Sequence, residues 1–124
     1  MAANPSFIGV VEISKPANTD LSTKYLYAAD LNSSGNVVVA GAGSTFIGII
    51  TGKPAAAGRA CTVAISGQVP MYAGGTIAIG APVKIDSSGL GVSASSGDKA
   101  IGRAMSAGAS GSQFELLIQP HTVA

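Results

Sequence analysis

The chain has 124 residues, a length that suits one domain with a single hydrophobic core. Charged residues make up only 10% of the sequence, the net charge is +1 and the basic residues are scattered, so no concentrated positive field predicts nucleic-acid binding. With three Tyr, three Phe and no Trp, an aromatic platform for single strands is not expected either. The shortage of charge indicates that much of the surface meets other protein. The alternative is a monomer whose surface is covered by Ser, Thr, Gly and Ala.

Cysteine usage and hydropathy bound the cellular context. Cys61 is the only cysteine, so an intrachain disulfide is excluded. The first residues lack a basic region followed by an apolar run, and no apolar stretch is long enough to cross a membrane. We therefore expect synthesis in a reducing cytoplasm and no membrane partner.

The sequence predicts short β-strands separated by turns rich in Gly, Ser, Asn and Asp. Side chains alternate in character over residues 61–66, which is the period of a half-buried strand. Residues 46–51 are apolar on both faces, which indicates a central, covered strand. The Asn-Ser-Ser-Gly sequence at 32–35 indicates a hairpin turn. The expected strands are seven before the turn at 86–89 and three after it. The first seven cover residues 7–13, 24–30, 37–39, 46–51, 61–66 and 68–72 and one short segment that follows the Gly-Gly bend at 74–75, and the last three cover residues 89–94, 100–105 and 113–119.

Strands of this length, with no convincing helix, favour an all-β fold that is either a small barrel or a sandwich of antiparallel strands. Residues 1–6 are small and polar and include Pro5, so we expect a flexible N-terminal arm. Residues 7–119 then form the single β domain, and residues 120–124 form a C-terminal tail.

The sequence also contains a weak internal echo. An apolar segment ending in Gly, a loop of small residues and an alternating strand follow one another twice. The first copy runs from Phe46-Ile47-Gly48 to residues 62–65, and the second from Ala100-Ile101-Gly102 to residues 115–118. Two readings stay open: a pair of similar hairpins packed about a pseudo-two-fold axis, or chance in a Gly- and Ala-rich chain.

Residues that could catalyse a reaction are few. The only histidine, His121, falls in the expected tail, where it is poorly placed to act as a general base. Cys61 lies on the apolar face of an expected strand and is predicted to fill the core rather than to act as a nucleophile. Asp86 and Asp98 fall in turns, where Asp hydrogen-bonds the local backbone. We therefore expect no enzyme, no metal site and no cofactor.

A series of Gly turns beside apolar strands carries a resemblance to a known family. The main pieces are Phe46-Ile47-Gly48-Ile49-Ile50, Cys61-Thr62-Val63-Ala64-Ile65-Ser66-Gly67, Tyr72-Ala73-Gly74-Gly75, Gly80-Ala81-Pro82-Val83, Ala100-Ile101-Gly102-Arg103-Ala104 and Phe114-Glu115-Leu116-Leu117-Ile118. In order and spacing, over roughly residues 20–118, they resemble the small capsid decoration, or cement, proteins of tailed bacteriophages.

The resemblance implies an all-β domain, barrel-like or tulip-like, with an extended N-terminal arm and a homotrimeric assembly. It implies binding to the major capsid protein on the outer surface of the mature virion head, at local three-fold positions, after synthesis in the bacterial host cytoplasm. The arm would make capsid contacts through Asn4, Pro5, Ser6, Phe7 and Ile8. The resemblance implies no catalytic residue, metal or cofactor and no direct contact with nucleic acid.

Two other functional classes remain as alternatives. A carbohydrate-binding module of a head fibre or tail-associated adhesin would need exposed aromatic rings, and Tyr25, Tyr27 and Tyr72 are the tyrosines available. An enzyme would need a pocket that holds His121 beside an acid or a hydroxyl group.

Overall fold

The computed structural model describes residues 8–42, 45–51 and 56–124, and these residues form strands, turns and loops without a helix. No helix that could span a membrane is therefore found in the described part of the chain. The nine strands are β1 (Ile8–Pro16), β2 (Ala28–Leu31), β3 (Val37–Val39), β4 (Gly48–Thr51), β5 (Ala60–Tyr72), β6 (Pro82–Ile85), β7 (Gly91–Ser93), β8 (Lys99–Ala104) and β9 (Gln113–Thr122).

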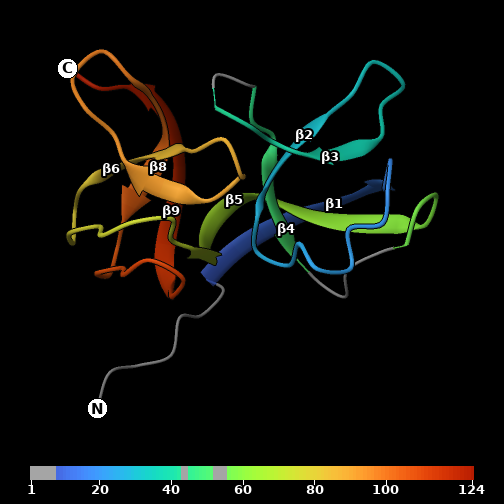
Figure 1. Ribbon diagram of the computed structural model, residues 1–124, viewed down its shortest axis with the longest axis horizontal. Helices are drawn as coiled ribbons and strands as arrows, with labels where there is room; N and C mark the ends of the chain where they lie inside the picture. The colour runs from blue at the N-terminus through green and yellow to red at the C-terminus, as the bar shows by residue number, and fades with distance from the viewer. Residues whose placement is uncertain (1–7, 43–44, 52–55) are drawn as a thin grey trace.

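The strands join into one antiparallel sheet that curls into a half-barrel, so the all-β prediction is confirmed. The neighbours along the sheet are β3-β2-β4-β5-β9-β8-β6-β7, and β1 pairs with β5 outside this path. Figure 1 shows β2, β3 and β4 on one side of the molecule and β6, β8 and β9 on the other, with β5 passing between them. The covered strand expected at residues 46–51 is β4, which lies between β2 and β5 and is buried at all four positions.

The structure differs from the expected strands at several places, and residues 46–47 and 89–90 lie outside the strands that were expected to include them. Residues 24–27 form turns, and the strand begins only at Ala28. β1 continues to Pro16, whose missing N–H is tolerated on an edge strand. β5 is continuous through Gly67, which takes a φ of 99° instead of ending the strand. β9 extends to Thr122 because Lys99 pairs with Thr122, so residues 120–122 lie in a strand where we expected a tail.

The internal echo is a structural repeat. Residues 28–51 match residues 82–105 without a gap, so β2, β3 and β4 correspond to β6, β7 and β8. The remaining strands correspond as well: β1 corresponds to the second part of β5, and the first part of β5 corresponds to β9. The pairing of β1 with β5 begins at Pro16 opposite Ala60. The pairing of β5 with β9 begins in the same way, at Tyr72 opposite Gln113. We call these units repeat 1 (β1 to the first part of β5) and repeat 2 (the second part of β5 to β9).

Hydrogen bonds in the turns reproduce the correspondence. The Asn32 side chain accepts bonds from the N–H groups two and four residues later, both at 3.0 Å, and Asp86 accepts the same pair at 2.8 and 3.0 Å. Each turn is completed by a Gly with positive φ, Gly35 in repeat 1 and Gly89 in repeat 2. Leu26, the one described non-Gly residue with positive φ, matches Gly80 in repeat 2.

The two hydrophobic cores match position by position. Repeat 1 encloses one buried cluster, and all seven of its members have counterparts in repeat 2 that lie in or against the second cluster. The pairs are Ala17 with Ala73, Leu21 with Ile77, Ala29 with Val83, Val37 with Gly91, Ile50 with Ala104, Cys61 with Phe114 and Val63 with Leu116.

One exchange of volume links two of these positions. In repeat 1 the two positions hold the medium-sized Val37 and the small Cys61. In repeat 2 they hold Gly91 and the large Phe114 ring, which lie beside each other. A Cβ at Gly91 would come within 2.9 Å of the Phe114 ring. The glycine therefore makes room for the phenylalanine, and close packing holds in both repeats with different residues.

A glycine at the same position in each repeat sets the approach of two strands. A Cβ at Gly102 would overlap the backbone carbonyl of Leu117, and a Cβ at Gly48 would overlap that of Ala64.

We expect Gly102→Ala to lower the free energy of unfolding by about 3 kcal/mol, because backbone atoms cannot yield without breaking the β8–β9 pairing. Gly75→Ala is the control, since its Cβ would be 4.0 Å from the nearest atom. Urea unfolding followed by circular dichroism measures both; equal stability would contradict the close approach.

The volume exchange predicts coupling between two core substitutions. Gly91→Val overpacks the site, and Phe114→Cys leaves a cavity that should cost about 3 kcal/mol or more. The double variant restores the residue pair that repeat 1 uses, so we expect it to lose clearly less stability than the sum of the single variants. A double-mutant cycle of unfolding free energies tests this, and strict additivity would overturn the packing argument.

Candidate functional site

The first candidate site is the N-terminal strand. Of the residues predicted for capsid contact, Asn4, Pro5, Ser6 and Phe7 lie outside the described residues, and Ile8 is the first residue of β1. The Ile8 side chain is 57% exposed. Within the described part of the chain β1 pairs with β5 alone, so its other edge presents unpaired backbone groups.

β1 is irregular at its start and carries a charge and a proline at its end. Gly9 has a φ of 61°, and the pairing with β5 shifts register on both sides of Val11, which is 53% exposed. Lys15 and Pro16 occupy the opposite end, where a charge and a missing N–H discourage strand addition. The exposed apolar side chains and the open edge therefore coincide at the start of the strand.

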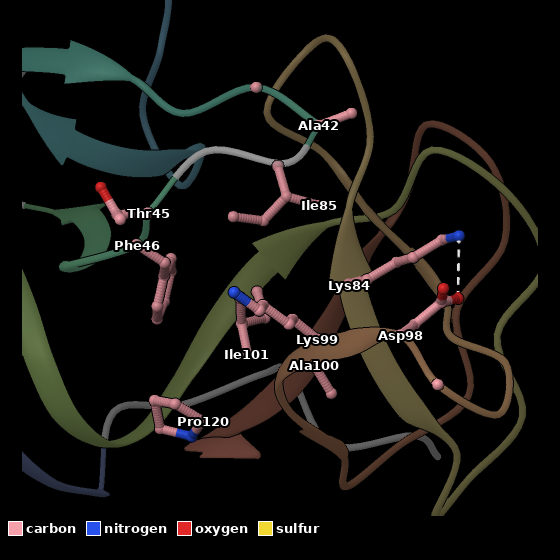
Figure 2. Close-up of a pocket in the computed structure, with 12 residues that line it drawn as sticks. Ala42, Thr45, Phe46, Lys84, Ile85, Asp98, Lys99, Ala100, Ile101 and Pro120 are labelled. Atoms are coloured by element: carbon pink, nitrogen blue, oxygen red, sulfur yellow. Dashed lines mark hydrogen bonds and ion pairs between the residues drawn. The ribbon is translucent and has the colours of Figure 1, made fainter. Parts of the chain in front are cut away.

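A pocket of about 550 Å³ lies between the two repeats. Loop residues from repeat 1, including Phe46, face β6, β8 and the end of β9 across it. Figure 2 shows Lys84 and Asp98 joined on one side of the pocket and Phe46 on the opposite side. Among the described residues Lys99 has no ion-pair partner. The lining mixes apolar side chains with charged and hydroxyl groups, a composition that suits the binding of a small molecule.

Asp98 holds the turn at the pocket rim. Its Oδ2 accepts a 2.8 Å bond from the Ser95 N–H and a 3.0 Å bond from Lys84 Nζ. The bond from Ser95, followed by that from Lys84, lowers the pKa of the Asp98 carboxyl below its ordinary value. Asp86 likewise accepts bonds from the backbone of its own turn, so both predicted turn roles are confirmed.

The tyrosines do not form one stacking surface. Tyr27 and Tyr72 line a second, smaller pocket with ring centroids 6.3 Å apart, but their planes are tilted by 52°. Lys24 Nζ lies 4.9 Å from the centre of the Tyr27 ring. Tyr25 packs against the larger core cluster. A flat platform for a sugar ring is therefore not formed by these three residues.

The structure places the possible catalytic residues apart. His121 lies on β9 opposite Ala100, and its Nδ1 is 2.7 Å from the carbonyl oxygen of Gln119. Cys61 is fully buried, and burial raises the pKa of its thiol. The described residues contain no cluster of three or more His, Cys, Asp or Glu side chains that could hold a metal ion.

Sequence reasoning missed two surface features. The pocket between the repeats has no local signal, because its walls come from segments that are distant in the sequence. Ile79 and Met105 are 72% and 47% exposed, and they lie beside each other because Gly80 N–H donates to the Ala104 carbonyl. Both were assigned to strands or turns without a surface role.

The described fold matches known proteins of phage heads. A family model described as phage cement protein matches residues 8–119, which include both repeats. The crystal structure of the head fiber gp8.5 N base in bacteriophage phi29 has the same fold, with a TM-score of 0.69 and 16% sequence identity over 93% of this chain and 98% of that chain. No curated protein matches the chain. The family match extends over nearly the whole described domain, and the chain therefore belongs to the phage cement protein family, as a structural protein of the phage head.

Proposed function

We propose that the protein decorates and stabilises the mature capsid by binding the outer surface of the major capsid protein lattice, as homotrimers at local three-fold positions. The observation that carries this proposal is the family match over residues 8–119. It covers every strand apart from the last residues of β9, so it concerns the whole domain and not one common hairpin.

The start of β1 is the part of the described chain best suited to reach the capsid. Its outer edge is unpaired, Ile8 and Val11 are exposed, and residues 1–6 continue from it. An extended segment can add to the edge of a neighbouring sheet, where backbone hydrogen bonds supply affinity and alternate side chains supply specificity. We assign capsid contact to this strand end together with Asn4, Pro5, Ser6 and Phe7.

Trimerisation allows each of these contacts to be weak. Once one arm is bound, the other two arms of a trimer are held near their own sites at a high effective concentration. A protein with 10% charged residues gains little from long-range attraction, so many modest contacts over a symmetric lattice suit its composition better than one charged patch. Bound trimers would tie neighbouring capsid subunits together against the pressure of packaged DNA.

The structural relative supports the outer surface as the location. That protein is the base of a head fiber. By analogy of fold, we place this protein on the outside of the virion after synthesis in the host cytoplasm, in contact with capsid protein and not with nucleic acid.

The function is tested by adding purified protein to expanded heads that lack it and counting bound copies per head. We expect saturable binding and greater resistance of the heads to heat. Removing residues 1–6 should leave the fold intact and weaken binding at least about tenfold, because every arm of a trimer is lost at once. Ser96→Asp, in an exposed loop, is the control.

Two results would count against the proposal. Failure of the full-length protein to bind any mature form of the head would remove the decoration function. Unchanged occupancy after removal of residues 1–6, with Ile8→Asp also binding normally, would leave decoration intact and move the contact away from β1.

A further inference from the structure

The two repeats of the chain pack against each other through different faces. The hairpin turn of repeat 2 enters repeat 1: the Gly89 carbonyl accepts a 2.9 Å bond from the Ala28 N–H, and a Cβ at Gly89 would collide with Val39. The matching turn of repeat 1 makes no equivalent contact with repeat 2, since no atom lies within 4 Å of the position that a Cβ at Gly35 would take. A two-fold relation would treat both turns alike, so the packing is head-to-tail, and the pseudo-two-fold reading of the echo is wrong.

We call the surface of repeat 1 on which repeat 2 packs the receiving face. This face is buried within the chain, whereas the corresponding face of repeat 2 is exposed. Within the chain, this face of repeat 1 packs into the same cluster as the core of repeat 2. The covered residues are Leu26, Ala28, Ala40, Ile49 and Ala64, all at most 1% exposed, with Tyr25 packed against them. Their counterparts are Gly80, Pro82, Ala94, Arg103, Leu117 and Ile79, and none of these is buried.

We call the surface with which repeat 2 packs against repeat 1 the entering face. Its residues are buried in repeat 2, and their counterparts in repeat 1 are more exposed. Repeat 2 buries Val69, Ile85 and Ile101 to 0%, 8% and 4% exposure. Their counterparts in repeat 1 are Ile13, Leu31 and Ile47, which are only half-buried. Each end of the molecule therefore presents one half of an interface whose other half is at the opposite end.

Around Ile79 the open receiving face carries one charged side chain, Arg103, and is otherwise free of charge. Residues 73–82 and 104–114 contain no charged side chain, and the bridge between Ile77 and Gly108 holds the two segments together. Ile79 and Met105 are the exposed large apolar residues on them. Loss of charge and enrichment in apolar residues including Met distinguish the centre of an interface from ordinary surface.

We propose that copies of this protein associate head to tail, with the entering face of repeat 1 in one copy on the open receiving face of repeat 2 in the next. The occupant is a second copy, because the chain already contains the complementary face and uses its equivalent between its own repeats. The inference rests on the self-association in the proposed function: a heterologous contact forms either a ring or a filament, and the proposed trimer requires that this contact close at three copies.

Two substitutions between the repeats make the contact between copies weaker than the contact within the chain. Pro82 stands where repeat 1 has Ala28, so the N–H that binds Gly89 has no equivalent. Arg103 replaces the buried Ile49, and its guanidinium bonds the Gly80 carbonyl at 3.3 Å. The open face is consequently compatible with water before the copies meet.

The test uses one variant on each face. Ile79→Glu places a charge on the receiving face, at a side chain that is already 72% exposed. Gly35→Asn fills the space into which the receiving face would fit, and Asn tolerates the positive φ of 78°. The controls are Ser96→Glu, in an exposed loop, and Gly58→Asn, where φ is 79° and no atom lies within 4 Å of the Cβ position. Circular dichroism establishes that all four variants are folded.

Native mass spectrometry and sedimentation then give the assembly. We expect the wild type and both controls to have the mass of three copies, and each face variant to be monomeric. An equal mixture of Ile79→Glu and Gly35→Asn retains one intact pair of faces, so we expect dimers that contain one of each and grow no further. A monomeric wild type at concentrations up to about 100 µM, face variants that remain trimeric, or a mixture without mixed dimers would overturn the inference.

These results are separable from the capsid proposal. A wild type that binds heads but is monomeric in solution contradicts the head-to-tail contact alone. A wild type that is trimeric through these faces but does not bind heads contradicts decoration alone.

Discussion

The structure depends on the backbone pairing of β5, the strand that the two repeats share. Its first part pairs with β1 and β4, and its second part pairs with β9. β5 is 13 residues long, and the positive φ of Gly67 lets it turn from one repeat into the other. β1, β4 and β9 pair with this strand directly, and the remaining strands are joined to it through β4 or β9.

Sharing a strand explains why a chain with a divided core behaves as one domain. Each repeat encloses its own matched set of buried side chains, and such a unit of about 55 residues would be marginal alone. The shared strand and the inserted turn at Gly89 fuse the second core with one face of the first. Between the repeats the residue types changed while the volume was kept, as Cys61 and Phe114 illustrate.

The asymmetry of this fusion leaves open the face to which we assign the proposed contact between copies. Because the repeats pack head-to-tail, one face remains open at each end, whereas a two-fold pair would have covered both. The open edge at the start of β1 is a second unpaired feature, since among the described residues β1 pairs with β5 alone. The surface assigned to the proposed contact between copies and the edge assigned to the proposed capsid contact lie on different parts of the chain.

By itself, the sequence determined the β-strand class and the turns. Alternation over residues 61–66 and the turns at Asn32 and Asp86 are local patterns, and the structure contains them. The order of Gly turns also identified the family. Only the tertiary structure decided that β5 is continuous, that β9 includes His121 and that Ile79 is exposed while its counterpart Tyr25 is packed. The reason is physical: a period of two tells which side chains share a face, but pairing with distant strands decides which face is covered.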